Sequence, residues 1–308
     1  MPERRLVAIV GATASGKTAA AVAVAARLPV EVVSADSRQV RAGMVIGTAA
    51  PTPEEQAAVP HHLVGHVPPN AAYTLADFLR EAREALDGIW ARGHLPLLVG
   101  GTGQYVWALL EGWQPPAVAP DLVLRAELEA QLAAEGVEAL FARLRDLAPL
   151  AAARLADPHN PRRVIRAIEV ALADAPPPTV EPPDFGWGVV GLDWPREALH
   201  ARADARVEAM YAAGLVEETR GLLARYDSAL PAFHTIGYAE AARVVSGEWD
   251  LPTAIERTKI ATHRLIRMQA TWFRGDDPRI RWVPGGDLDA VVGAVEATVE
   301  AAGAPPVG

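Results

Sequence analysis

The sequence predicts an α/β protein with a P-loop, parallel-sheet core and an inserted helical domain. A buried strand, Leu6–Val10, runs directly into G-x-x-x-x-G-K-T, the pattern of a phosphate-binding loop. Strand and helix signals alternate up to residue 115, and a run rich in Ala, Leu, Glu and Arg without strand signals follows. We therefore expect a core made of residues 1–115 and 176–300, with C-terminal helices, and a helical insertion over 116–175.

The elements of the core can be placed in order along the chain. A helix is expected from Tyr73, because Thr74 and Asp77 have capping-box spacing, and it should stop at Gly93. The segment Gln104–Leu110 opens another helix, and three or four helices should follow the strand Gly188–Trp194 up to Arg274. The expected strands are Leu6–Val10, Val30–Ser34, Leu95–Gly101 and Gly188–Trp194. A proline-rich connector is expected at Pro176–Asp184 and a frayed tail at Ala301–Gly308.

Composition limits the class of protein. Half of the 308 residues are hydrophobic, which is enough for a globular core, and no cysteine is present for disulfides or thiolate metal sites. No segment is long and apolar enough for a signal peptide or a membrane span, so we expect a cytoplasmic protein without a membrane partner. The net charge is −9, yet basic residues gather in two places. One cluster is Arg162, Arg163 and Arg166, and the other runs through Arg257, Lys259, Arg264, Arg267, Arg274, Arg279 and Arg281.

The glycine-rich loop predicts a site for a diphosphate or triphosphate. Backbone N–H groups of such a loop surround a phosphate, and the N-terminus of the following helix faces the same anion. Lys17 adds a positive charge, and the Thr18 hydroxyl can hold Mg²⁺ against the phosphates. The residues expected to bind phosphate are Gly11, Ala12, Thr13, Ala14, Ser15, Gly16, Lys17 and Thr18.

Two strand ends near this loop carry further information. Asp36 follows the second strand and could be a general base, a Mg²⁺ ligand through water, or the N-cap of the next helix. Nucleotide hydrolases of this class have an Asp after a third apolar strand, but this chain has Gly100 and Gly101 there. An N-K-x-D guanine-reading motif is also absent. These observations disfavour a GTPase or an ATPase.

Two clusters have competing interpretations. His61, His62 and His66 include an i,i+4 pair, but prolines flank the group and it lacks a carboxylate, so loop histidines that cap a strand are favoured over a metal site. The arginines at 162, 163 and 166 form either a solvated face paired with Glu169 and Asp157, or a contact to phosphates of a nucleic acid.

Taken together, the motifs resemble those of the tRNA dimethylallyltransferase (isopentenyl-tRNA transferase) family. The matching segments extend from Val10 to about Gly275. They are GATASGKT, ADSRQ followed by GM and IGTA, PHHL, GGTGQYVWALLEG, NPRRVIRAIEV, MYAAGLVEETRGL, TIGYAEA and QATWFRG.

The resemblance implies an activity: transfer of a dimethylallyl group from dimethylallyl diphosphate to N6 of adenosine 37 of tRNA, 3′ of the anticodon, with Mg²⁺ as cofactor. It implies that Asp36 is the general base and that Arg220 and Thr13 to Thr18 hold the diphosphate. It also implies that Thr102 lies beside the target base and that a monomer binds the anticodon stem-loop. The positions that match tRNA-contacting residues are Asp36, Ser37, Arg38, Gln39, Thr102, Arg125, Arg162, Arg163, Val164, Ile165 and Arg166.

The sequence departs from the family pattern in the segment after Gln39. The family usually has Tyr, Asp and Lys where this chain has Arg41, Val45 and Ala50. Two alternatives stay open at this point: a small-molecule kinase whose arginine cluster closes over ATP, and a non-catalytic P-loop protein that binds RNA. A kinase would bind ATP more tightly than dimethylallyl diphosphate, and in a non-catalytic protein Asp36 would be dispensable.

Overall fold

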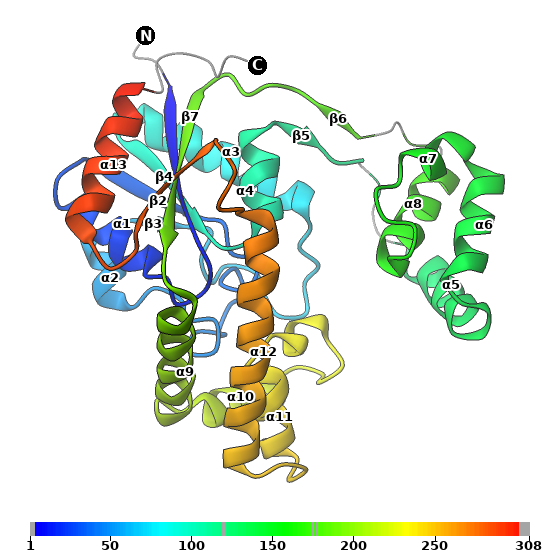
Figure 1. The fold of residues 1–308 in the computed structure, drawn as a ribbon. Coiled ribbons are helices and arrows are strands. Elements are labelled where there is room, and N and C mark those ends of the chain that lie inside the picture. Colours follow the sequence, from blue (N-terminus) through cyan, green and yellow to red (C-terminus); the bar gives the residue numbers. More distant parts are fainter. Residues whose placement is uncertain (1–3, 117, 119–120, 174, 176–177, 302–308) are drawn as a thin grey trace. The chain divides into compact units, whose positions relative to one another are not determined.

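The computed structural model describes residues 4–116, 118, 121–173, 175 and 178–301. The chain forms two compact units (Figure 1). The larger consists of Met1–Glu111 and Pro182–Gly308, and the smaller of Gly112–Glu181. The predicted insertion, residues 116–175, lies within this smaller unit.

A six-stranded parallel sheet forms the centre of the larger unit. Its order is β3-β2-β4-β1-β7-β8. The strands are β1 (Arg5–Val10), β2 (Val30–Ser34), β3 (His61–His62), β4 (Leu95–Gly100), β7 (Gly186–Asp193) and β8 (Ile280–Pro284). The central strand β1 pairs with β4 on one side and β7 on the other, and Leu6 to Val10 are fully buried. This confirms the predicted parallel α/β core, in which strands covered on both faces read as continuous apolar runs.

Helices cover both faces of this sheet (Figure 1). On one face α1 (Lys17–Ala25) and α13 (Leu288–Ala301) pack with Val7, Ile9 and Leu97. On the other lie α3 (Leu75–Ala91) and α4 (Gly103–Leu110), where the rings of Phe78 and Tyr105 stack at 4.1 Å. A short helix, α2 (Pro53–Ala58), precedes β3. The capping box of Thr74 and Asp77 at the start of α3 is present as predicted.

Four α-helices lie between β7 and Arg274, within the predicted range of three or four. They are α9 (Arg196–Ala212), α10 (Leu215–Leu223), α11 (Tyr238–Val245) and α12 (Leu251–Trp272), with a 3₁₀ turn at Pro231–His234. Their shared core contains Tyr211, Leu215, Phe233 and Tyr238 together with Met44 from the loop after β2. Leu199 and Ala203 of α9 and Ile266 of α12 pack on Ala14 of the glycine-rich loop. Helices α9 and α12 therefore pack directly against the phosphate loop.

Glu31 on β2 is the centre of a buried ionic cluster. Its side chain is 4% exposed and accepts two hydrogen bonds from Arg92 at 2.7 Å. His62 lies 2.7 Å from one carboxylate oxygen and His94 2.9 Å from the other. The hydrogen bonds from Arg92, above all, lower the pKa of Glu31 to about 2.

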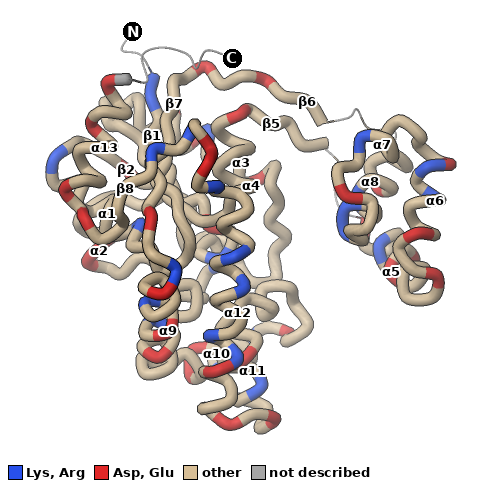
Figure 2. The backbone as a smooth tube through the Cα atoms, viewed as in Figure 1, with Lys and Arg blue, Asp and Glu red and all other residues tan. Residues whose placement is uncertain are grey.

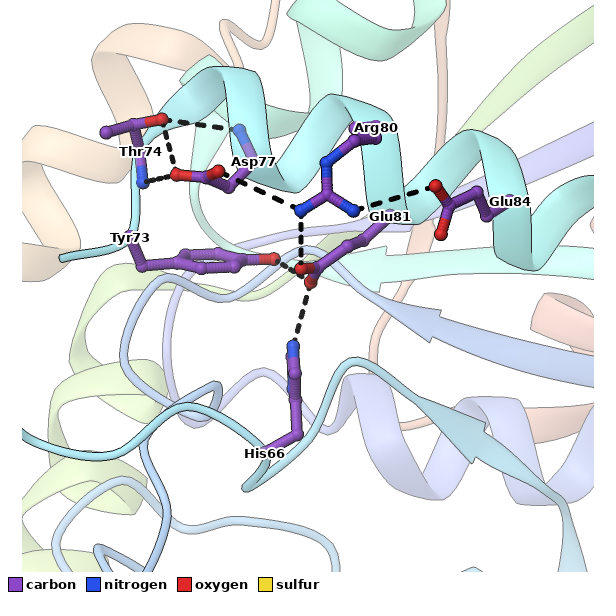
Figure 3. Close-up of polar contacts among 7 residues, drawn as sticks. All are labelled: His66, Tyr73, Thr74, Asp77, Arg80, Glu81 and Glu84. Atoms are coloured by element: carbon purple, nitrogen blue, oxygen red, sulfur yellow. Dashed lines mark hydrogen bonds and ion pairs between the residues drawn. The ribbon is translucent and has the colours of Figure 1, made fainter. Parts of the chain in front are cut away.

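A second carboxylate, Glu81 on α3, anchors the loop before that helix (Figure 3). Tyr73 donates a hydrogen bond to Glu81 at 2.9 Å, and His66 lies 2.8 Å from the same oxygen. Arg80 donates to the other oxygen at 3.1 Å. The predicted histidine group is thus divided: His61 lies 2.8 Å from the Val59 carbonyl, and His62 and His66 contact two different carboxylates. His61 and His62 themselves form β3 and do not cap a strand from a loop. Among the described residues no group of three or more His, Cys, Asp or Glu could hold a metal ion.

The smaller unit is a four-helix cluster entered through a two-stranded ribbon. Its helices are α5 (Leu122–Glu135), α6 (Val137–Leu147), α7 (Pro149–Arg154) and α8 (Pro161–Leu172), packed around Leu128, Leu140, Leu144 and Ile168. Strands β5 (Trp113–Gln114) and β6 (Thr179–Val180) pair antiparallel. The sequence analysis assigned no strand to these segments, because two residues within proline-rich text give no periodic signal.

The C-terminal part of the chain adds a strand, β8, and a helix, α13, to the larger unit. The sequence analysis also assigned no strand to β8. Of the predicted tail, Ala301 is the last residue of α13, and the rest lies outside the described residues. In the described part of the chain we find no helix long and apolar enough to cross a membrane.

Candidate active site

The chemistry-bearing residues meet where β1, β2 and β4 end. Parallel neighbours place their carboxyl ends at one edge, so the glycine-rich loop after β1 lies beside Asp36 after β2 and Thr102 after β4. The Thr102 hydroxyl accepts a hydrogen bond from the Ser37 N–H at 3.0 Å. The two strand ends that the sequence singled out are therefore in direct contact.

The loop from Gly11 to Thr18 has the backbone of a phosphate cradle. Gly16, at the N-cap of α1, has φ 93°, and Ala14 has φ 63°. Gly11 has no room for a side chain, since an added Cβ would lie 2.8 Å from the Ser15 hydroxyl. That hydroxyl is buried without a hydrogen-bond partner among the described residues. A phosphate oxygen in the cradle is the acceptor that this donor lacks.

Lys17 is desolvated at the base of the loop. Its Nζ donates hydrogen bonds to the carbonyls of Gly11 at 3.0 Å and Ala12 at 2.9 Å. Burial lowers the pKa of Lys17 to about 8; the charge of Asp36 raises it and that of Arg206 lowers it further. Asp36 and Arg206 therefore lie close enough to Lys17 for their charges to shift its pKa.

Asp36 is half-buried and held by the backbone that follows it. Its Oδ1 accepts hydrogen bonds from the N–H groups of Arg38 at 2.9 Å and Gln39 at 3.4 Å. These bonds cap the turn over residues 37–40 and not a helix, because the next helix, α2, begins at Pro53, so the N-cap interpretation was wrong. They leave Oδ2 without a described partner and available for a proton. The cap and the general base are thus compatible, because they use different oxygens.

The two glycines that end β4 are explained by close packing. An added Cβ on Gly100 would lie 2.1 Å from the Ala35 carbonyl, and one on Gly101 would lie 2.3 Å from the Gln269 amide. Gln269, from α12, donates to the Gly101 carbonyl at 3.0 Å and accepts from the Thr13 N–H at 2.8 Å. It ties the glycine-rich loop to the end of β4, a role that the sequence analysis did not assign.

Two arginines of α9 were also missed: Arg202 contacts the loop, and Arg206 lies near enough to Lys17 and Asp36 for their charges to interact. Arg202 donates to the Ala14 carbonyl at 3.0 Å, and its guanidinium lies 4.3 Å from the centre of the Trp194 ring. Burial lowers the pKa of Arg206, while the charges of Asp36 and Glu55 raise it. Their i,i+4 spacing on a helix was a signal available in the sequence.

Arg220, the arginine expected at the diphosphate, lies on α10. Its side chain is 57% exposed, and its described ion pair is with Glu217 at 3.8 Å. No described contact joins Arg220 to the glycine-rich loop, and its role at the diphosphate stays a prediction.

In the helical unit, a buried carboxylate binds two of the arginines that were predicted to contact tRNA. Glu169, with a 1% exposed side chain, accepts hydrogen bonds from Arg125 at 2.6 and 2.9 Å and from Arg166 at 3.2 Å. Arg162 and Arg163 are exposed. The side chains of Val164 and Ile165, two predicted tRNA-contacting positions, are buried in the core of this unit. Only part of the predicted cluster is thus presented at the surface.

The second basic cluster is divided in the same way. Basic positions recur along α12 (Figure 2), at Arg257, Lys259, Arg264 and Arg267. Lys259 pairs with Glu208, and Arg279, beyond the helix, pairs with Asp277 and Glu111. Arg264 and Arg267 are exposed.

A strand that enters a glycine-rich loop, with a half-buried lysine and a carboxylate at the next strand end, defines a P-loop α/β protein with a site for a phosphate group. The model of the IPP transferase family matches residues 39–276, and that of isopentenyl transferases matches residues 4–61. The chain belongs to the IPP transferase family, as its motifs suggested.

Individual relatives agree with this assignment. A tRNA dimethylallyltransferase of Chloroflexus aurantiacus is 52% identical over 285 residues, 91% of this chain and 96% of that relative. One of Anaeromyxobacter dehalogenans is 46% identical over 299 residues, 95% and 99% of the two chains. The solved tRNA isopentenylpyrophosphate transferase of Bacillus halodurans has a TM-score of 0.72 and 36% identity, covering 97% of this chain and 98% of its own. A eukaryotic dimethylallyltransferase solved acting on tRNA, 23% identical, shares the fold with a TM-score of 0.73 over 93% of this chain and 75% of its own.

Proposed function

We propose that this chain is a tRNA prenyltransferase that moves the dimethylallyl group of dimethylallyl diphosphate to N6 of adenosine 37 in tRNA. The names of its relatives support the reaction class. One observation carries the assignment of the site: Asp36 follows β2 at the sheet edge where the glycine-rich loop follows β1, close enough to Lys17 and Arg206 for its charge to raise the pKa of both. A base for the nucleophile and cations for the leaving group are what this transfer needs.

The leaving group makes the main electrostatic demand. Negative charge grows on the diphosphate as the bond between C1 and its oxygen breaks, so donors aimed at that oxygen stabilise the transition state more than the ground state. The loop N–H groups, Lys17 and Arg206 supply this charge, and Arg202 fixes the loop through the Ala14 carbonyl. We assign the diphosphate role to Arg206 in preference to Arg220.

The adenine amine is a weak nucleophile because its lone pair is delocalised into the ring. As N6 forms its bond to C1, the amine proton passes to Oδ2 of Asp36, a contribution of typically ~10²–10⁴-fold. Diphosphate leaves with the bonding electrons of the C1–O bond. A stacked adenine cannot reach Asp36, so the base must be flipped out of the anticodon loop. Thr102 lies beside that position.

The residues present fit Mg²⁺ held mainly by the ligand. Mg²⁺ prefers oxygen donors and is often bound by few protein groups plus substrate phosphates. Thr18 offers its half-buried hydroxyl at the start of α1 for this purpose. The bound ion would neutralise part of the charge on the departing diphosphate.

We further propose that the helical unit contacts phosphates of the anticodon stem-loop through Arg162 and Arg163. Such contacts position an RNA without reading its sequence. We also propose that the protein acts as a monomer, with the catalytic residues in its larger unit. A tRNA substrate agrees with the cytoplasmic location that the sequence predicts.

The test is incubation with radiolabelled dimethylallyl diphosphate, Mg²⁺ and unmodified tRNA, followed by digestion to nucleosides. Label should co-migrate with N6-dimethylallyladenosine and be lost when adenosine 37 is replaced. Asp36→Asn should bind both substrates and lose roughly 10²-fold or more in single-turnover rate, because an amide cannot accept the proton. A rate above about a tenth of the wild type would remove Asp36 from the role of base.

A further inference from the structure

The turn that follows Asp36 in the chain is capped by groups from another part of the fold. The Glu218 carboxylate, on α10, accepts hydrogen bonds from the N–H of Ile46 at 3.1 and 3.2 Å and from that of Val45 at 3.3 Å. The next N–H, of Gly47, donates to the hydroxyl of Tyr238 at 3.2 Å, and that hydroxyl donates to Glu218. Three successive N–H groups of the turn thus end on one carboxylate–phenol pair.

Tyr238 is fitted closely to this turn. Its side chain is fully buried, and an added Cβ on Gly47 would lie 2.5 Å from its ring. Burial and the neighbouring Glu218 raise the pKa of Tyr238, so the phenol keeps its proton and remains a donor to the carboxylate. The packing of Gly47 against Tyr238 and the hydrogen bonds to Glu218 therefore require the same conformation of the turn.

The same turn holds the side chain of Gln39, which lies three residues after Asp36. The Gln39 amide donates to the carbonyls of Ala49 at 2.9 Å and Thr48 at 3.4 Å. Its amide oxygen accepts from Ser34, the last residue of β2, at 3.3 Å. The Gln39 backbone N–H is one of the two donors to Asp36. A continuous set of hydrogen bonds thus leads from Glu218 through the turn and Gln39 to Asp36.

We propose that Glu218 and Tyr238 are positioning residues for the transfer reaction: by fixing residues 44–49 they hold Gln39, and with it the carboxylate of Asp36, in the orientation that receives the N6 proton. This inference rests on the proposed role of Asp36. Neither side chain touches the phosphate cradle in the described contacts, so the effect should fall on the chemical step rather than on diphosphate binding. A displacement of about 1 Å of a catalytic group can cost as much as ~10²-fold in rate.

The test compares Glu218→Gln and Tyr238→Phe with Glu248→Gln. The first replaces one carboxylate oxygen by a donor that N–H groups cannot use, and the second keeps the ring but removes the hydroxyl. Glu248, the control, is an exposed carboxylate of the same helical group that pairs with Arg243. Three quantities are measured: single-turnover rate with both substrates saturating, affinity for dimethylallyl diphosphate, and hydrogen exchange of the peptide spanning 39–50.

We expect Glu218→Gln to lower the single-turnover rate by ~10-fold or more and to speed exchange of the 39–50 amides, with diphosphate affinity within about twofold of wild type. Tyr238→Phe should act in the same direction, and the double variant should lose less than the product of the two single effects, since both act through one turn. Glu248→Gln should match wild type in all three measurements.

Several outcomes overturn the inference. A normal rate in Glu218→Gln, with faster exchange or a lower melting temperature, would show that the pair only stabilises the fold. If Glu218→Gln does not fold, Tyr238→Phe decides alone, and an unchanged rate in that variant rejects the positioning role. The two proposals fail differently: an active Asp36→Asn removes the base, whereas a fully active Glu218→Gln beside an inactive Asp36→Asn removes only the positioning residues.

Discussion

The desolvated ammonium of Lys17 predicts how binding of dimethylallyl diphosphate depends on pH. Burial of the ammonium lowers the pKa of Lys17 from its ordinary 10.5 to about 8. The negative charge of a bound diphosphate would return the pKa to or above its ordinary value. Binding above pH 8 must therefore take up a proton, and affinity must fall as pH rises through the free-state pKa.

The size of the effect follows from this difference. At pH 7 the free lysine is already charged and the cost is negligible. At pH 9 about one molecule in eleven is charged, so affinity should be ~10-fold weaker, and at pH 10 it should be ~100-fold weaker. Titration calorimetry at pH 8 in two buffers of different ionisation heat should show uptake of about half a proton per diphosphate bound.

The neighbouring charges give this prediction an internal test. Asp36→Asn removes a charge that raises the pKa of Lys17, so the decline should begin at a lower pH. Arg206→Gln removes a charge that lowers the same pKa, so the decline should begin at a higher pH. In Lys17→Met the dependence above pH 8 should disappear. Equal affinities of the wild-type protein at pH 7.5 and pH 9.5, or an unchanged dependence in Lys17→Met, would refute the reasoning.

Three other predictions follow from the site and the fold. Arg206→Ala should lower both diphosphate affinity and single-turnover rate by at least tenfold, about 1.4 kcal/mol, whereas Arg220→Ala should stay within about threefold of wild type. Replacing Arg162 and Arg163 together by alanine should weaken tRNA binding and reduce the slope of log K against log salt by about 1.4. Glu31→Gln should destabilise the fold by about 2–3 kcal/mol at pH 7, measured by denaturant unfolding, because it leaves Arg92 and two histidines without their anion.

Arg220→Ala is the control for Arg206→Ala, and the other two predictions have controls of their own. Arg145 and Arg154 are exposed on the same helical unit, and replacing them should leave the salt slope unchanged; an equal loss would indicate general attraction by charge. The pKa of Glu31 is lowered to about 2, so its contribution is present above pH 4.5 and is lost as pH falls toward 2. The stability difference between wild type and Glu31→Gln should therefore shrink below about pH 4, and a constant difference would contradict the assignment.

Local features of the site could be predicted from the sequence because their hydrogen bonds are local. The phosphate cradle is set by Gly11, Gly16 and the helix that begins at Lys17. Its proximity to Asp36 and Thr102 follows from the parallel order of three strands, each recognisable as an apolar run.

The features that escaped depend on tertiary packing. The i,i+4 spacing places Arg202 and Arg206 on one helix face, but only the packing of Leu199 and Ala203 on Ala14 brings that face to the loop, where Arg202 contacts the Ala14 carbonyl. Glu169 was expected in a solvated pair but is buried, so it draws Arg125 and Arg166 inward. Composition shows that such charges exist, but burial decides which of them remain available to a ligand.

The ribbon at the entrance of the helical unit has a consequence for how such proteins diversify. Trp113 pairs with Val180, and the Glu181 N–H donates to the Gly112 carbonyl at 2.9 Å, so the inserted segment leaves and re-enters the core one hydrogen bond apart. The two ends of the core at this point are therefore as close as the ends of a β-hairpin loop, whatever the length of the segment inserted between them. Segments joined in this way can be lengthened, shortened or exchanged between relatives while the catalytic half keeps its sequence, because insertions succeed where the two ends already meet.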